Sequence, residues 1–155
     1  MKKLLVLLLL VVSVVVAQAE VFSIRGLFWG DSKADVIDAE GEDYFDYSMD
    51  GTVIAYWRDD FDTITTVTYY FLNHKLIAVA YYLIDDHFSR LKHALESKYG
   101  EPTEFIYGVA GWVMPDQNTA IYLGQGVGET SLGYFALDVL RKIQNARDKT
   151  DREIL

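Results

Sequence analysis

The chain of 155 residues has no cysteine, only two prolines and only three histidines. Without cysteine it can form no disulfide, no thiolate metal site, no iron–sulfur cluster and no Cys-linked lipid anchor. The scarcity of proline and a 51% hydrophobic composition argue against a fibrous or disordered chain. Length and composition instead predict one domain with a hydrophobic core.

Positive charge is also scarce, since 14 Lys and Arg stand against 23 Asp and Glu, for a formal net charge of −9. Nucleic-acid binding needs clustered basic residues, so we expect no nucleic-acid partner. His74 falls in a predicted turn, and His87 and His93 are six residues apart on a predicted helix, which places them on different sides of it. We therefore expect no metal and no cofactor.

The N-terminal segment has the layout of a secretory signal peptide. Met1-Lys2-Lys3 is followed by an apolar run from Leu4 to Val16 and then by the small-x-small site Ala17-Gln18-Ala19. The apolar run is shorter than the ~20 residues that span a bilayer. We predict that residues 1–19 are a signal peptide of bacterial type, that the mature protein is periplasmic or secreted, and that no membrane span remains after cleavage.

The rest of the chain, residues 20–145, reads as a single α+β domain. Helices are predicted to start at the capping-box-like Ser32-Lys33-Ala34-Asp35 and at Asp85-Asp86, and to end at Gly41 and Gly100. Leu137–Asn145 is a third predicted helix. Beyond it, residues 146–155 form a charged tail, for which a solvated helical extension and a frayed end both remain open. Strands are predicted at 21–28, 42–48, 52–58, 63–72, 76–83, 103–107, 111–114, 119–123 and 132–135.

The order of these elements suggests an internal repeat. Gly41-Glu42 follows the first predicted helix and Gly100-Glu101 the second, and each pair leads into a strand that ends in tyrosine. The pattern predicts two α-β-β-β repeats, over residues 20–84 and 85–145. Their strands are expected to form an antiparallel sheet with the helices on one face, which makes a two-layer sandwich.

The segment from Leu91 to Tyr122, with Tyr99-Gly100-Glu101-Pro102 and Trp112, resembles the helix, G-x-P, strand, Trp and strand pattern of BamE/SmpA-like and beta-lactamase-inhibitor-protein-like exported bacterial domains. Gly26 to Val36 also resembles the W-G-x-S-x-x-x-V opening of other exported bacterial proteins. The resemblance implies binding or assembly roles. The chain departs from the BamE-like pattern because it has no lipobox cysteine, and no functional residue carries over.

Aromatic residues are abundant, with eleven tyrosines, eight phenylalanines and three tryptophans. Along residues 65–72, Val67, Tyr69 and Phe71 form the better core face, and the threonine-bearing face, which includes Tyr70, tolerates water. A two-residue loop after this strand would pair Tyr70 with Ile77 and a three-residue loop would pair it with Ala78, and these alternatives exchange the faces of the next strand.

An exposed aromatic sheet surface is typical of a protein-binding site, although ordinary strand and core composition explains many of these residues. The candidate binding residues are Tyr70, Tyr81, Tyr82 and Trp112.

Other constellations favour plain structural interpretations. Asp59-Asp60-Phe61-Asp62 lacks the glycine and terminal glutamate of an EF-hand, so a polar turn is preferred to a calcium site. Gly124 to Gly128 is followed by a strand and an acidic residue, which indicates a hairpin loop and not a phosphate cradle. Ser89, His93 and Ser97 share a helix face, but no orienting acid or oxyanion hole accompanies them.

With no catalytic residues identified, we favour a non-catalytic exported module for binding or envelope assembly, with a protein partner. Two alternatives stay open. One is a small exported hydrolase whose carboxylates converge only in the fold, and the other is an inhibitor of an extracellular enzyme.

The first prediction concerns export. N-terminal sequencing of the protein recovered from the cell that produces it should begin at or near Glu20, because signal peptidases cleave after small-x-small sites. An intact Met1 on protein recovered from the cytoplasm would contradict the prediction.

Overall fold

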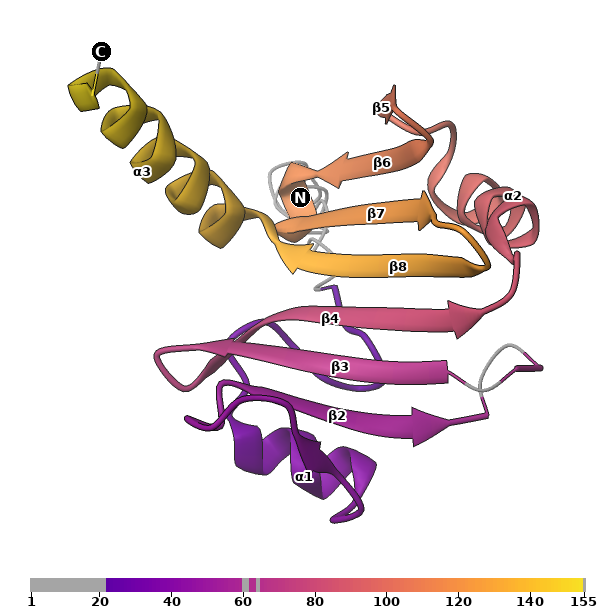
Figure 1. Ribbon diagram of the computed structural model, residues 1–155, viewed down its shortest axis with the longest axis vertical. Coiled ribbons are helices and arrows are strands. Elements are labelled where there is room, and N and C mark those ends of the chain that lie inside the picture. Colours follow the sequence, from indigo (N-terminus) through magenta and orange to yellow (C-terminus); the bar gives the residue numbers. More distant parts are fainter. Residues whose placement is uncertain (1–21, 60–61, 64, 155) are drawn as a thin grey trace, which may run out of the picture.

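The computed structural model describes residues 22–59, 62–63 and 65–154, and side chains through residue 147. The predicted signal peptide lies outside these residues. The fold is α+β, with one antiparallel sheet of eight strands in the order β1-β2-β3-β4-β8-β7-β6-β5 (Figure 1). The elements are α1 (Lys33–Glu40), β1 (Phe45–Asp46), β2 (Val53–Arg58), β3 (Thr65–Leu72), β4 (Lys75–Ile84), α2 (Phe88–Tyr99), β5 (Glu104–Ile106), β6 (Val109–Met114), a 3₁₀ turn (Pro115–Gln117), β7 (Thr119–Gln125), β8 (Glu129–Ala136) and α3 (Leu137–Ile154).

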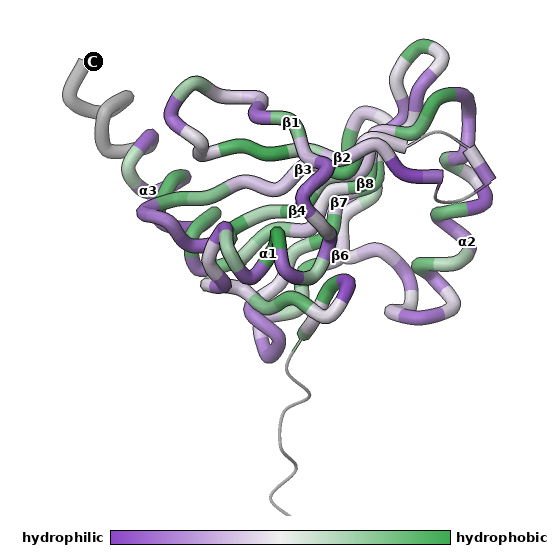
Figure 2. Tube along the Cα trace, turned by 90° about the horizontal axis from the view of Figure 1, so that it is seen from below, coloured by the Kyte–Doolittle hydropathy of each residue, from purple (hydrophilic) through white to green (hydrophobic). Residues whose placement is uncertain are grey.

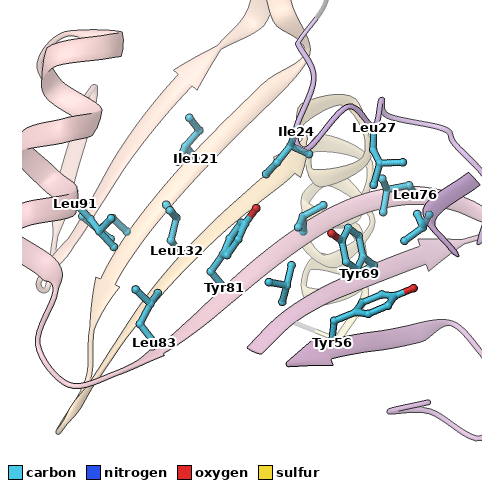
Figure 3. Close-up of a cluster of buried hydrophobic side chains, with 14 of the residues drawn as sticks. Ile24, Leu27, Tyr56, Tyr69, Leu76, Tyr81, Leu83, Leu91, Ile121 and Leu132 are labelled. Atoms are coloured by element: carbon cyan, nitrogen blue, oxygen red, sulfur yellow. The ribbon is translucent and has the colours of Figure 1, made fainter. Parts of the chain in front are cut away.

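One face of the sheet, which we call the core face, carries most of the buried apolar side chains. Alternate residues of β3 and β4, among them Val67, Tyr69, Val79 and Tyr81, point into this core, as the period of two in a strand requires. Figure 3 shows these side chains spread along the core face, from Tyr56 on β2 to Ile121 on β7. In Figure 2, α1 and α2 lie on the same side of the strands.

Helix α1 begins and ends where the sequence predicts. The Ser32 side chain accepts a hydrogen bond from the backbone N–H of Asp35, whose carboxylate accepts in return from the backbone N–H of Ser32. This capping box satisfies donors that a helix start leaves without partners. Gly41 ends the helix at φ 100°, a conformation that residues with a Cβ rarely adopt.

Helix α2 presents the predicted apolar stripe to the core. Leu91 and Leu95 are buried and Phe88 is half-buried against the same cluster. Gly100 ends this helix at φ 83°, and the indole N–H of Trp112 on β6 donates to the Gly100 carbonyl at 2.8 Å. This hydrogen bond holds the C-terminal end of α2 against β6.

The predicted strand at 21–28 is wrong, because within it the described chain makes only an isolated bridge between Ile24 and Leu27. The segment that follows, residues 29–31, instead forms hydrogen bonds with two separate strands, β7 and β4. The Trp29 indole N–H donates to the Thr119 hydroxyl on β7 at 2.8 Å. Gly30 and Asp31 exchange backbone hydrogen bonds with Leu76 on β4, at 2.9 and 2.8 Å.

The β3–β4 hairpin combines both turn alternatives. Asn73 and His74, at φ 51° and 62°, form a tight two-residue turn that pairs Leu72 with Lys75. A β-bulge between Tyr70 and Phe71 then shifts the register, so that Tyr70 pairs with Ala78. The bulge places Tyr82 on the same face as Tyr70 and turns Tyr81 into the core.

Helix α3 starts directly after β8 and projects from the sheet (Figure 1). Its first turn is held by Asn118, whose carbonyl oxygens accept from the backbone N–H groups of Leu137 and Asp138, both at 2.9 Å. The Asn118 side-chain amide donates to the Asp138 carboxylate at 2.8 Å. The helix extends through the charged segment after Asn145 as far as Ile154, so the helical alternative for that segment is the one observed.

The second prediction tests the α2 stripe. Leu91→Ala should lower the free energy of unfolding by roughly 2–5 kcal/mol, because the Leu91 side chain is 6% exposed and its removal leaves a cavity. Urea unfolding of the purified variant measures this. His93→Ala on the exposed side of the same helix is the control, and it should change stability by no more than about 0.5 kcal/mol. Equal midpoints for the two variants would show that the stripe is not part of the core.

The open sheet face as candidate functional site

The face of the sheet opposite the core face is the candidate site, and we call it the open face. Strand alternation and register put aromatic side chains from six strands on it, with small residues between them. Its larger side chains are partly or largely exposed: Trp57, Tyr70, Tyr82, Ile84, Tyr122 and Phe135.

The four candidate residues divide between the two faces. Tyr70 and Tyr82 lie on the open face, and Tyr82 is 43% exposed. Tyr81 and Trp112 lie in the core instead, 5% and 1% exposed. Tyr81 points inward because of the β-bulge, and Trp112 because its position on β6 alternates with the open-face residues Gly111 and Val113.

Tyr70 and Tyr82 reach toward each other across the open face. Their strand positions lie on opposite sides of the paired residues Thr68 and Ala80, and their hydroxyls are 3.1 Å apart. The two rings thereby arch over Thr68 and Ala80, which are buried like the other small residues of this face, Ala55, Ala78 and Ala120. Burial and the hydrogen bond with Tyr82 raise the pKa of Tyr70, so its hydroxyl stays neutral at physiological pH.

Two concavities flank this tyrosine pair and share both of its rings. The first, which we call the tyrosine pocket, has a volume of about 470 Å³. Its walls combine aromatic rings, threonine hydroxyls and one carboxylate: Tyr47, Val53, Thr66, Thr68, Tyr70, Tyr82 and Glu129. No lysine or arginine is among these lining residues, so the pocket favours a cationic or neutral polar group.

The second concavity, which we call the α3 groove, lies between the open face and the base of α3 and has a volume of about 360 Å³. Its lining is apolar apart from the two tyrosine hydroxyls: Tyr70, Ile77, Ala78, Tyr82, Phe135, Ala136, Val139, Leu140 and Ile143. Ile143 remains more than half exposed at its outer rim. The α3 groove can therefore accept apolar side chains.

Glycines determine how the remaining aromatic rings lie. A Cβ atom placed on Gly133 would come within 2.5 Å of the Phe135 ring, and one on Gly111 within 2.9 Å of the Tyr122 ring. The absence of a side chain at these glycines lets both rings lie low over the strands. The Phe135 and Tyr122 rings also meet edge to face, with centroids 5.9 Å apart.

The sequence analysis missed Trp57, Tyr122 and Phe135. Trp57 lies at the β1 end of the face, where it stacks on Phe45 with centroids 5.6 Å apart. Strand alternation within 119–123 and 132–135 is the signal that could have grouped Tyr122 with Phe135. The pairing of β7 with β8 that brings them together is not visible in either segment alone.

The strongest cluster of ionisable groups is on the core side, around Glu40 at the end of α1. This side chain is 4% exposed, and its carboxylate accepts from the guanidinium groups of Arg25 and Arg58 and from the Tyr69 hydroxyl at 2.6 Å. Burial raises the pKa of Glu40, but the hydrogen bonds from Arg25, Tyr69 and Arg58 outweigh it and hold that pKa below its ordinary value. A carboxylate kept ionised in this way suits a structural ion pair and not a general acid.

The other polar candidates stay apart. His74 is in the β3–β4 turn, and His87 and His93 occupy the start and the exposed side of α2. Within the described residues, no three His, Cys, Asp or Glu side chains come together as a possible metal site. Asp60 and Phe61 of the acidic cluster lie outside the described residues. The helices of the described chain include none with the length and hydrophobicity to cross a membrane.

Comparison of the chain with protein-family models, curated proteins and solved structures found no match.

The third prediction concerns Glu40. Replacing it with glutamine should lower the free energy of unfolding by about 2–3 kcal/mol, because two partly buried guanidinium groups lose their counter-charge. Thermal or urea unfolding at neutral pH measures the loss. Glu42→Gln, a change of an exposed residue two positions away, is the control and should leave stability within about 0.5 kcal/mol of the wild type.

The same carboxylate predicts a pH dependence. The pKa of Glu40 is lower in the folded state, so its contribution is fully present above the ordinary glutamate value of about 4.3 and is lost as the pH falls through the lower folded value. Below about pH 4.3 the stability of Glu40→Gln should therefore fall less steeply than that of the wild type. Parallel slopes would show that Glu40 titrates normally in the folded protein.

Proposed function

We propose that this protein is a non-catalytic, exported binding module that holds a protein partner on the open face of its sheet. The observation that carries the proposal is the open face itself, where two concavities meet at the Tyr70–Tyr82 pair. Tyrosine and tryptophan are favoured at protein interfaces because they bury a large area and keep a polar group for hydrogen bonding. The signal-peptide layout of residues 1–19 supports a periplasmic or secreted location.

We also propose that the scaffold is a two-layer sandwich built from two related halves, residues 20–84 and 85–145. Corresponding strands support this, because the same register of pairing recurs in each half. Three residues in one cross-strand row of the first half correspond to three in the second: Tyr56, Val67 and Tyr81 with Trp112, Ile121 and Tyr134.

Two further features support the duplication. The Tyr56 hydroxyl donates to the carbonyl of Gly41 at 2.9 Å, just as Trp112 donates to that of Gly100, so each helix end is tied to the corresponding strand. The correspondence also makes Ala80 equivalent to Gly133, and these two residues pair with each other where β4 meets β8. An approximate two-fold axis through that pair would relate the halves. A scaffold of this kind agrees with the resemblance to BamE/SmpA-like domains.

The hydrolase alternative has less support in the geometry. The two concavities of the open face contain a single carboxylate, Glu129, whereas glycoside hydrolysis needs a pair of carboxyl groups a few ångströms apart. Glu40 is enclosed by its partners on the opposite face.

The inhibitor alternative draws support from the β5–β6 hairpin. Tyr107 at its tip has φ 50° and is fully exposed, and Phe105 and Ile106 beside it are more than half exposed. A projecting apolar tip fits the cleft of another protein. Tyr107→Ala would then abolish binding of the target, although the change is remote from the Tyr70–Tyr82 pair.

The fourth prediction tests the open face in the producing cell. A photo-crosslinking phenylalanine analogue placed at Tyr82 or Trp57 should give a covalent adduct with a partner protein, because both side chains are exposed on the proposed contact surface. The same analogue at Asp38 on α1 or His93 on α2 is the matched control and should give none. Adducts confined to the helix positions, or none at any position, would overturn the proposal.

A further inference from the structure

We infer that the partner docks through a basic amphipathic helix, whose apolar side chains enter the α3 groove and whose lysine or arginine side chain enters the tyrosine pocket beside Glu129. The inference rests on the function proposed above and specifies the partner of that surface.

The two concavities adjoin each other but differ in chemistry. Tyr70 and Tyr82 line both, so one ligand segment that crosses the tyrosine pair reaches both. On the α3 side, Val139, Leu140 and Ile143 offer an apolar wall. On the other side, the carboxylate of Glu129 and the electron-rich faces of the tyrosine rings attract a cation.

The charge of the surrounding protein also favours a positively charged ligand. The chain has a net charge of −9, and a second acidic residue of the open face, Glu104, lies beside Tyr122, where its carboxylate together with burial raises the pKa of the Tyr122 hydroxyl. The lining residues of both concavities include no lysine or arginine. A basic side chain is therefore complementary to the tyrosine pocket, and an acidic one would be repelled there by Glu129.

The edges of the sheet offer little to an occupant that binds as an added strand. The edge strands β1 and β5 have two and three residues, so strand addition gives few main-chain hydrogen bonds. The concavities lie over the open face, although the tyrosine pocket reaches as far as Tyr47, which follows β1. On a sheet face, recognition depends on side chains. Phe135 and Glu129 mark the two ends of the site and are six residues apart on β8, which corresponds to roughly 20 Å.

A helix of about 14 residues covers that length and presents apolar side chains along one face. Helix α3 can form one wall of a groove for a second helix because the first turn of α3 is fixed in place. Asn118 binds the first two backbone N–H groups of α3 and the Asp138 side chain, so the apolar wall keeps its place relative to Phe135. Ile143, exposed at the rim, is the side chain that an incoming helix would cover.

The experiment uses the mature chain and a synthetic probe. The probe is a peptide of about 18 residues made of leucine, alanine and lysine, with leucines at helical spacing along one face. Two peptides serve as comparisons, one with the same composition in scrambled order and one with glutamate in place of lysine. Isothermal titration calorimetry measures Kd for each peptide with the wild type and four variants.

We expect the leucine–lysine peptide to bind at least tenfold more tightly than either comparison peptide. Glu129→Gln should weaken its binding about three- to fivefold, as loss of one partly exposed ion pair does. Ile143→Ser should weaken it about tenfold through lost apolar contact, and its exposure means that the variant should still fold. Glu42→Gln and His93→Ala change exposed residues that line neither concavity and should bind as the wild type does.

Each contrary result overturns a defined part of the inference. Equal affinity for the scrambled peptide would mean non-specific attraction to an acidic protein, and equal affinity for the glutamate peptide would refute the charge assignment. A dimer in light scattering that Ile143→Ser converts to a monomer would identify a second copy of this chain as the occupant. If the peptides fail to bind while cross-links still form at Tyr82, the binding function stands and the partner chemistry is wrong.

Discussion

The pairing of β4 with β8 is the interaction on which the rest of the structure depends. These strands lie at the middle of the sheet, and each half of the chain attaches its remaining strands outward from one of them. Ala80 and Gly133 meet at the centre of this pairing, with almost no side chain between them on the open face. The open face is continuous across the two halves because this junction is small. Its two concavities lie on either side of the Tyr70–Tyr82 pair, which spans the neighbouring strands β3 and β4.

Local features of the fold were predictable because their causes are local. The Ser32 capping box, the stops at Gly41 and Gly100, and the alternation of Val67 and Tyr69 each follow from a few neighbouring residues. The predicted strand at 21–28 failed for the opposite reason. Its apolar residues are rich in β-formers but make only one isolated bridge, between Ile24 and Leu27. The chain that follows contacts the sheet at Leu76, which is distant in sequence.

The site was predicted only in part, because membership of a sheet face depends on register. Tyr70 could be placed from the threonines beside it, but Tyr81 and Tyr82 could be separated only by knowing that the hairpin contains a bulge. Tyr122 depends on Gly111 of the neighbouring strand, Phe135 depends on Gly133 of its own strand, and both depend on the pairing of β7 with β8. The wall supplied by α3 depends on the contact with Asn118, which is about twenty residues away in sequence.

The bulge at Tyr70 and Phe71 has a consequence for how this gene can vary. Ile77 is the extra residue of the bulge and has no pairing partner on β3. Deletion of its codon would produce a regular hairpin and would keep every later residue of β4 on its present face. A codon deleted between Val79 and Leu83 would instead exchange the faces on one side of the deletion and turn buried side chains of β4, such as Tyr81, toward water. Insertions and deletions in related genes should therefore gather at the hairpin end of β4 and be rare in its middle.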